Sequence, residues 1–514
     1  MFHYGQDHLT AGKALQIARG QLKAGWSEAT RSAIQRNRSI VEKIVQSEAA
    51  VYGINTGFGP LCSTRISVED SDTLQYNILK SHSVGVGEAI PKEIAKLMLI
   101  LKVHALSQAH SGVQISTLER IQWNIEQDII PVVPKQGSVG ASGDLAPLAH
   151  LFLPLIGHGK VEYKGAVHAT EVVFQREGIQ GIELGAKEGL ALINGTQFIA
   201  AYAIKVVEQL HSCLSQADII GAMMLEGLLG SASPFRAELH QLRAYKGNQH
   251  VAARMRTLLK DSEIIESHAN CERVQDPYSL RCIPQVHGAS RTAWLHLKEA
   301  VEIELNSVTD NPVIINEDLT ISGGNFHGQP LALPLDYACL AASEIGNISD
   351  RRTYLSLMGV AKGVPKLLMQ EAGLNSAFMM LQYTTAALAS ENKGLCFPAS
   401  ADSIPTSLGQ EDHVSMGSIG GRKALQVTQN VKKILAIELI CAAQSFDYHR
   451  PLKSSQILDH IHVFIRSRIS HAEEDRIFAE DIEKSIEIIE NQEIINQIEN
   501  NQLSTEFDYL FEQF

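Results

Sequence analysis

The sequence predicts a mainly α-helical protein. An N-terminal domain of helices and loops, residues 1–195, precedes a long-helix bundle, residues 196–514, with few short strands. Two observations predict this fold class. Segments of the second part keep apolar residues at helical spacing over many turns. The first part is interrupted by clusters of glycine and proline, which favour loops over regular elements.

The N-terminal domain begins with two predicted helices, Thr10–Ala24 and Ala29–Val51. The stretch Val51–Pro60 holds three glycines and a proline, so we expect a loop there. Loops of this kind often carry functional residues on a rigid scaffold. The later segments of this domain are predicted as a helix at 72–82, two helices within 91–127, an extended piece at 131–134 and short extended pieces within 151–185.

Long amphipathic segments dominate the second domain. The first follows Leu192–Gln197 and reaches about Leu229. Comparable helical segments are predicted at 286–309, 330–358, 376–391, 421–445, 455–469 and 479–498. Segments of this length are typical of helices that pack side by side in a bundle. Two short apolar runs around a polar turn at 312–322 predict a β-hairpin.

The composition disfavours several classes of partner. The 514 residues carry a formal net charge of −13, which argues against nucleic acid and anionic membranes. No apolar stretch reaches the roughly 18 residues of a membrane span, and the N-terminus lacks the pattern of a signal peptide. The seven cysteines are scattered, without a Cys-x-x-Cys pair typical of zinc or redox sites. We therefore expect a reduced, cytoplasmic protein without a metal.

A glycine-rich stretch, Gly137–His150, has Ala141-Ser142-Gly143 at its centre. Asp144 is expected to be the N-cap of the apolar helix that follows. In a sufficiently tight turn, the amide nitrogen of Gly143 can attack the carbonyl of Ala141 with loss of water. Loss of a second water, which removes the Ser142 hydroxyl, leaves a dehydroalanine inside a five-membered ring. That product is an electrophile, although the triplet by itself is more often an ordinary turn.

Further polar stretches lie between the predicted helices, at Gln275–Arg281, Gly323–Gln329 and Pro405–Ser415. Their residues also have structural interpretations. Arg281 by itself would more often form an ion pair, and Glu411 would belong to a solvated cap, since the spacing around it is poor for a metal site. Tyr52 by itself would be a core aromatic residue, and His82 would be a residue favoured at a helix C-terminus. Asn194 and the glycine after it would form a turn.

Taken together, these stretches resemble the aromatic amino acid lyase family, whose members carry a 4-methylidene-imidazol-5-one (MIO) group built from Ala-Ser-Gly. The resemblance spans roughly residues 7–490. The matching stretches, in family order, are Tyr52–Gly59, Gly140–Leu148, Leu192–Thr196, Tyr278–Arg281 and Asn325–His327. The chain departs from the family pattern at Ser83 and at Leu408-Gly409.

The resemblance implies a role for each matching residue. The implied catalytic residues are Tyr52, Ala141, Ser142, Gly143, Asn194, Gln275 and Tyr278, and the implied substrate-binding residues are His82, Arg281, Phe326 and Glu411. Ala141, Ser142 and Gly143 would form the MIO autocatalytically, so no external cofactor is expected. Tyr52 would be the base, and Arg281 would bind the substrate carboxylate.

Three stretches most resemble the family members that act on histidine, namely Ser81-His82, Gln275–Cys282 and Gln410–Met416. The resemblance therefore implies elimination of ammonia from L-histidine to give trans-urocanate, the first step of histidine degradation. It also implies a homotetramer with active sites shared between subunits. Two alternatives remain open. One is a tyrosine or phenylalanine ammonia-lyase or aminomutase of the same family, and the other is a non-catalytic helical assembly protein.

Overall fold

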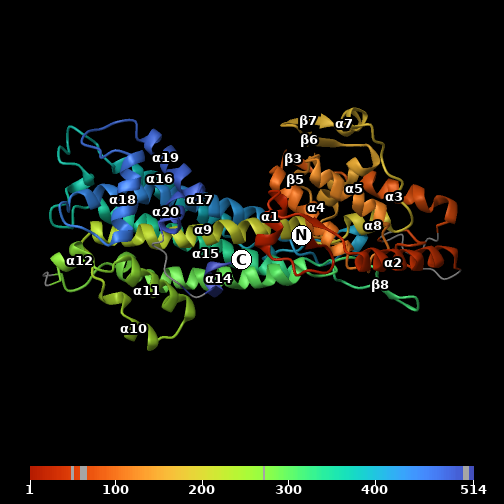
Figure 1. Ribbon diagram of the computed structural model, residues 1–514, viewed down its shortest axis with the longest axis horizontal. Helices are drawn as coiled ribbons and strands as arrows, with labels where there is room; N and C mark the ends of the chain where they lie inside the picture. The colour runs from red at the N-terminus through yellow and green to blue at the C-terminus, as the bar shows by residue number, and fades with distance from the viewer. Residues whose placement is uncertain (48–50, 58, 60–65, 270–272, 502–506, 508) are drawn as a thin grey trace.

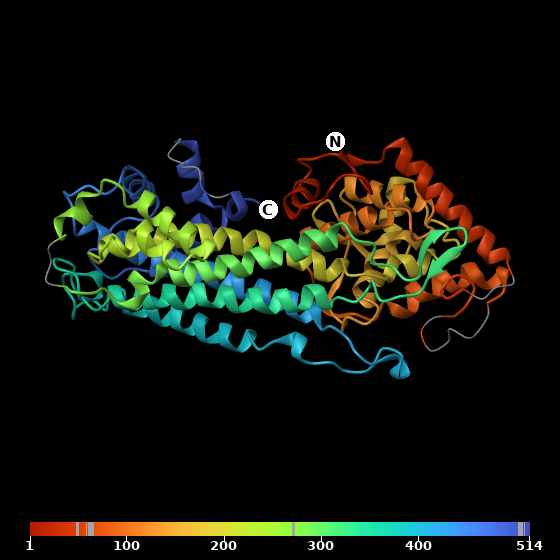
Figure 2. The same cartoon turned by 90° about the horizontal axis from the view of Figure 1, so that it is seen from below.

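The computed structural model describes residues 1–47, 51–57, 59, 66–269, 273–501, 507 and 509–514. The molecule is elongated, with long helices along its length and a lobe of shorter helices at one end (Figure 1, Figure 2). Most of the described chain is helical, which confirms the predicted fold class. Phe58 and Pro60 of the expected loop, and Cys62 and Cys271, lie outside the described residues.

The lobe at one end is built from the N-terminal part of the chain (Figure 1). Its helices are α1 (Ala11–Ala18), α2 (Glu28–Gln46), α3 (Val68–His82), α4 (Lys92–Leu106), α5 (Ile115–Glu126), α6 (Leu145–Phe152), α7 (Thr170–Glu177) and α8 (Glu188–Ile193). Its strands are β1 (Phe2–His3), β2 (Ala24–Gly25), β3 (Val86–Ala89), β4 (Ile130–Pro131), β5 (Pro134–Gln136), β6 (Lys160–Tyr163) and β7 (Ala166–Ala169). Helix α4 is buried throughout from Leu97 to Leu106, including the polar residues Lys102 and His104, so it forms the centre of the lobe.

The strands form small sheets rather than one large sheet. Strand β1 pairs in parallel with β2, and β3 pairs antiparallel with β5. Strand β6 lies between β4 and β7, antiparallel to both, with Val161 opposite His168. In the second half of the chain, β8 (Val313–Asn316) and β9 (Leu319–Ile321) form the predicted hairpin, with Val313 opposite Ile321.

Five long helices form the body of the molecule. They are α9 (Gln197–Gly227), α14 (Ile283–Leu305), α15 (Gln329–Ser356), α16 (Met379–Leu395) and α17 (Gly417–Asp447). The shorter helices around them are α10 (Ala237–Gln241), α11 (Lys246–Leu258), α12 (Glu263–Ser267), α13 (Tyr278–Arg281), α18 (Gln456–Arg468), α19 (Phe478–Glu490), α20 (Glu493–Asn500) and α21 (Tyr509–Glu512). Helices α9 and α17 are buried over most of their length and pack against each other. Among the described residues, no helix combines the length and apolar character needed to cross a membrane.

A buried charge cluster ties three of these helices together. The Asp218 carboxylate on α9 accepts hydrogen bonds from Arg254 Nε of α11 at 2.9 Å and from Arg291 Nη2 of α14 at 2.6 Å. It also pairs with His287 Nδ1 at 2.7 Å. Burial would raise the pKa of Asp218, but Arg291 and its other partners outweigh burial and hold this pKa well below its usual range. The cluster therefore holds an ionised carboxylate in the core, where its loss would leave Arg291 unpaired.

The structure differs from the predicted elements where helices are short. The first helix covers only Ala11–Ala18, because Gly20 has a left-handed φ of 72° just beyond it. Residues 479–498 form two helices rather than one, since Gln492 has a φ of 54° between them. The region 151–185 includes helix α7 as well as strands. The helices α10 to α13 had not been predicted. Helices α10, α12 and α13 span at most five residues, which gives too little periodicity to detect, whereas α11 has 13 residues and was missed despite its length.

The proposed domain boundary after residue 195 stays a prediction. The main hydrophobic core is continuous from the lobe into the long helices, for example from Ile94 to Ile199. The β8–β9 hairpin also returns to the lobe, where Ile314 packs in a small core with Ile40 and Val41 of α2. Packing therefore joins the lobe to the long helices in two places, through the shared main core and through the β8–β9 hairpin.

Candidate active site

The Ala141-Ser142-Gly143 turn lies against the segment that joins α8 to α9. The amide of Gly195 donates to the carbonyl of Ser142 at 3.3 Å, and the amide of Asp144 donates to the carbonyl of Gly195 at 2.9 Å. Gly143 has a φ of 84°, and a Cβ at this residue would lie 2.1 Å from the Gly195 oxygen. Ser142 also has a positive φ, 48°. The turn is therefore tight, and only glycine fits at position 143.

Asp144 does not cap the helix that follows it, contrary to the sequence prediction. Its carboxylate instead accepts hydrogen bonds from the amides of Phe198 and Ile199, at 2.8 and 3.1 Å. These amides lie in the first turn of α9, where backbone N–H groups have no helical partner. Burial raises the pKa of Asp144 to about 7, although both amides and Lys102 oppose that rise. Asp144 therefore fixes the turn to the bundle's central helix.

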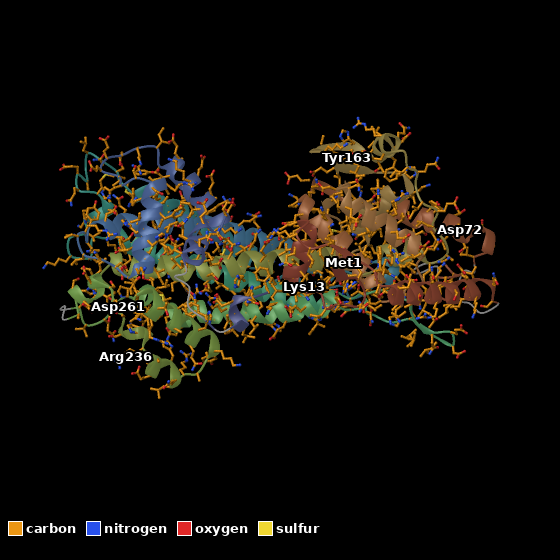
Figure 3. The ribbon with its side chains drawn as sticks, viewed as in Figure 1. Met1, Lys13, Asp72, Tyr163, Arg236 and Asp261 are labelled. Carbon is orange, nitrogen blue, oxygen red and sulfur yellow. The ribbon has the colours of Figure 1, made fainter. Side chains whose placement is uncertain are left out.

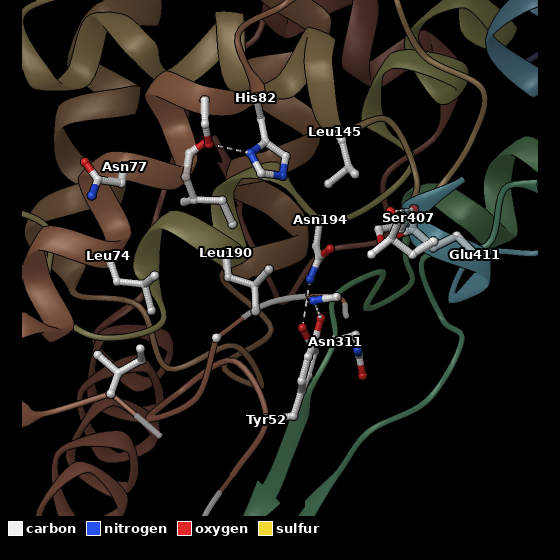
Figure 4. Close-up of a pocket in the computed structure, with 17 residues that line it drawn as sticks. Tyr52, Leu74, Asn77, His82, Leu145, Leu190, Asn194, Asn311, Ser407 and Glu411 are labelled. Carbon is white, nitrogen blue, oxygen red and sulfur yellow. Dashed lines mark hydrogen bonds between the residues drawn. The ribbon is translucent and has the colours of Figure 1, made fainter. Parts of the chain in front are cut away.

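A cavity of about 620 Å³ opens beside this turn. Five of the predicted site residues line it, on segments far apart in the sequence (Figure 4). They are Tyr52, His82, Ser142, Asn194 and Glu411. A second cavity of about 480 Å³ shares Tyr52, Ser142 and Glu411 with the first and is also lined by Phe326. The two cavities are thus neighbouring parts of one cleft around Ser142.

Glu411 is held in this cleft by three hydroxyl groups. Its Oε1 accepts from Ser142 Oγ at 2.8 Å. Its Oε2 accepts from Thr406 Oγ1 at 3.0 Å and from Ser407 Oγ at 2.6 Å. These hydroxyl donors fix the direction of the carboxylate. Ser407 and Leu408 both have positive φ values, 49° and 57°, so the backbone before Glu411 is strained into this loop.

His82 faces the same cleft from the C-terminal end of α3. Its Nδ1 lies 3.0 Å from the Ser81 hydroxyl. Burial lowers the pKa of His82, while the Ile78 carbonyl and the nearby Glu411 partly oppose that change. The ring is therefore mainly neutral at neutral pH, and it can donate or accept a hydrogen bond without adding a charge.

Tyr52 and Asn194 complete the wall of the cleft. The Tyr52 hydroxyl accepts a hydrogen bond from the amide of Gly59 at 3.3 Å. The Asn194 side-chain nitrogen donates to the carbonyl of Asn311 at 2.7 Å and to Asp310 Oδ1 at 3.3 Å. Asn311 lines both cavities. A proton-bearing phenol, an amide and a carboxylate therefore converge on the Ser142 turn.

Three predicted site residues lie elsewhere. Gln275, Tyr278 and Arg281 form a cluster of their own, in which Arg281 Nη2 donates to Gln275 Oε1 at 3.0 Å and the guanidinium lies 4.6 Å from the Tyr278 ring centre. Tyr278 is 71% exposed and lines a separate cavity beside α15 and α16. Asp261, shortly before this cluster, lies at the opposite end of the molecule from Asp72 of α3 (Figure 3). Within a single chain, Gln275, Tyr278 and Arg281 therefore lie away from the cleft around Ser142.

Some residues of the cleft had not been singled out from the sequence. Thr406 and Ser407 hold Glu411, Asn311 holds Asn194, and Leu408, a departure from the family pattern, lines the cavity. The sequence signal that could have found Ser407 and Thr406 is their position, four and five residues before the candidate carboxylate Glu411. Among the described residues, no group of histidine, cysteine and acidic side chains has the geometry to hold a metal.

Comparison with known proteins accords with this arrangement. The profile of the family described as aromatic amino acid lyase matches residues 9–467. The chain belongs to the aromatic amino acid lyase family. It is 46% identical to a histidine ammonia-lyase of Sorangium cellulosum, over 94% of this chain and 95% of that protein.

Solved structures of the family share the fold. The crystal structure of histidine ammonia-lyase from Trypanosoma cruzi matches with a TM-score of 0.89 and 37% identity, over 97% of this chain and 95% of that one. A tyrosine aminomutase from Streptomyces globisporus matches with a TM-score of 0.91 and 32% identity, over 97% and 99%. The lyase family fold therefore carries more than one reaction, and the cleft residues must decide between them.

Asp144→Ala should destabilise the protein, because the buried amides of Phe198 and Ile199 would lose their acceptor. A buried donor without a partner costs about 1–3 kcal/mol. Asp144→Asn keeps one acceptor oxygen and should lose less. Urea unfolding measures both variants against the wild type. Equal stability of Asp144→Ala and the wild type would contradict the capping role of Asp144.

Proposed function

We propose that this protein is an ammonia-lyase that converts L-histidine to trans-urocanate and ammonia. One observation carries the proposal. The Ser142 turn, the Tyr52 phenol, the His82 imidazole and the Glu411 carboxylate share one cleft. The names of its relatives, histidine ammonia-lyases in Sorangium cellulosum and Trypanosoma cruzi, support the same substrate. Their identity to this chain, 46% and 37%, extends over almost its whole length.

The Ala141-Ser142-Gly143 turn fits the protein-derived MIO group expected for the family. The nitrogen of Gly143 belongs to a residue without a side chain, in a turn where Ser142 and Gly143 both have positive φ. Gly195 holds the turn from one side through backbone hydrogen bonds. The MIO would supply an electrophile for the substrate's amino group. All three residues come from this chain, so the proposal needs no external cofactor.

The cleft residues can divide the remaining chemistry among them. Tyr52 lies in the wall beside Ser142 and is the proposed base for the proton that leaves the carbon next to the substrate ring. Glu411, oriented by the Thr406 and Ser407 hydroxyls, would accept an N–H hydrogen bond from the imidazole. His82, mainly neutral, would face the same ring.

Glu411 favours histidine over phenylalanine. A phenyl ring has no N–H or O–H group for this carboxylate, so its binding would leave a desolvated acceptor unpaired. Sites built around a polar partner reject analogues that lack it much more strongly than apolar pockets reject a change in size. The tyrosine aminomutase match shows that the fold alone does not separate these reactions, and in our proposal Glu411 is the residue that distinguishes histidine from phenylalanine.

We further propose a homotetramer in which subunits share active sites. Arg281 suits a substrate carboxylate because its fork can bind both oxygens, yet it lies outside the cleft of its own chain. A second subunit would bring its Arg281, Gln275 and Tyr278 to that cleft. The exposed apolar residues of α15 and α16 offer a contact surface for such a subunit. They include Leu333, Tyr337, Leu340, Tyr354, Met380 and Tyr383. The cytoplasmic location stays a prediction.

Ser142→Ala should abolish urocanate formation and keep the fold, because the ring needs the Ser142 hydroxyl as a leaving group. The wild-type mass should fall short of the sequence mass by two waters, and the variant should never show that deficit. Intact-protein mass spectrometry, absorbance of urocanate and the thermal midpoint measure the three outcomes. A wild-type mass equal to the sequence mass would rule out the ring and favour a non-catalytic assembly.

Glu411→Gln should reduce histidine turnover more than any residual phenylalanine turnover, because only the imidazole donates an N–H to this side chain. The loss of kcat/KM on L-histidine should be about 100-fold or more, the scale on which polar partners discriminate. Turnover of both amino acids is read from product absorbance. Equal losses on the two substrates would remove Glu411 from the specificity argument.

Mixed oligomers of Ser142→Ala and Arg281→Ala chains should regain activity that neither variant has by itself. A cleft with Ser142 from one chain and Arg281 from another is complete only if sites are shared. Co-expression of the two variants with different affinity tags, followed by purification on both tags, gives the mixed oligomer. Persistent inactivity of a folded mixed oligomer would show that each chain builds its own site.

A further inference from the structure

Asn194 is held in a single orientation at the floor of the cleft. It is 3% exposed and lines the cavity (Figure 4). Its side-chain nitrogen donates to two acceptors, the Asn311 carbonyl at 2.7 Å and Asp310 Oδ1 at 3.3 Å. A flipped amide would place its oxygen against two other oxygens. The amide oxygen of Asn194 is therefore the atom left to act in the cleft.

The orientation of Asn194 depends on a buried ion pair behind it. Lys187 Nζ donates to Asp310 Oδ2 at 2.5 Å, and the two side chains are 0% and 4% exposed. Asp310 Oδ1 also accepts from the amide of Asn311 at 2.7 Å. Burial would raise the pKa of Asp310, but Lys187 and Lys102 outweigh it and hold the pKa below its usual value. Asp310 is thus ionised, and each of its two carboxylate oxygens already accepts a hydrogen bond.

A second lysine holds the backbone of the same residue. Lys102, on the central helix of the lobe, donates to the carbonyl oxygens of Asn194 and Ala191. Lys102 is 1% exposed, and burial lowers its pKa to about 7; its nitrogen lies at the C-terminal end of α8. The main chain of Asn194 is therefore fixed by Lys102, while its side chain is fixed by Asp310.

We propose that Asp310, held by Lys187, is a positioning residue that turns the Asn194 amide oxygen towards the substrate. This inference rests on the proposed function, because it assigns Asn194 an acceptor role in that cleft. The proposed amine and MIO chemistry brings N–H groups to this wall, and an amide oxygen can accept from them, whereas an amide nitrogen cannot. The ion pair therefore acts on the reaction through Asn194, without contact with the substrate.

Asp310→Asn tests the proposal with little change in size. Lys187 requires an acceptor, so the new amide would turn its oxygen to Lys187 and its nitrogen to Asn194. The new amide nitrogen would then face the Asn194 amide nitrogen, and two donors cannot bond. The Asn194 amide would therefore rotate its nitrogen into the cleft. We expect kcat on L-histidine to fall about 10- to 100-fold, the scale of a misplaced active-site group. We express kcat per chain whose measured mass is two waters below the sequence mass. This separates a misplaced Asn194 from incomplete ring formation.

The double variant K187M/D310N provides the rescue. Without the ammonium, the new amide is free to turn its oxygen back to Asn194 and to the Asn311 amide. We expect kcat to rise towards the wild-type value, even though the ion pair is gone. A purely structural ion pair would give the opposite pattern, in which both variants lower the thermal midpoint and leave kcat unchanged.

Asp218→Asn is the matched control, since Asp218 is equally buried and paired with arginine far from the cleft. It should lower the thermal midpoint and leave kcat unchanged. A wild type that releases no urocanate would overturn the proposed function, and this inference with it. An active wild type with an equally active Asp310→Asn variant, or a double variant no better than Asp310→Asn, would overturn this inference alone.

Discussion

The site depends on one close contact between two backbone segments, Gly143 and Gly195. A Cβ at Gly143 would lie 2.1 Å from the Gly195 oxygen, so the segments approach more closely than any side chain permits. This contact joins the Ser142 turn to the start of α9, and Asp144 strengthens it by capping that helix. The Ser142 turn is therefore fixed to the central helix of the bundle, and not to a surface loop.

The long helices hold residues at two distant ends of one molecule. The cleft with Ser142 lies in the lobe, while Arg281 and Tyr278 lie near the other end of the bundle. Rigid helices, tied by the Asp218 cluster, cannot fold back to bring these ends together. The proposed assembly of several chains would resolve this separation, because a neighbouring subunit could place its own end beside the cleft. The long helices thus account both for the elongated shape and for the proposed sharing of sites between subunits.

Much of the fold and of the site could be predicted from the sequence. The long helices were evident because their apolar periodicity extends over many turns, and the 312–322 hairpin was evident from its turn. The residues of the cleft could be proposed because family motifs carry them. The short helices α10, α12 and α13 and the partner of Asp144 could not be predicted. A side chain that caps a helix 54 positions away leaves no local pattern.

The sequence by itself determined the class of fold, the Ala141-Ser142-Gly143 triplet and the identity of the family, since these depend on local periodicity and on contiguous motifs. Only the tertiary structure decided that the nitrogen of the Asn194 amide faces Asp310 and Asn311, and which carboxylates face which donors. Contacts such as Lys187 with Asp310, 123 positions apart, form when separate segments are buried together. Burial removes water as an alternative partner, so each buried donor must find one acceptor, and that requirement sets the geometry of the cleft.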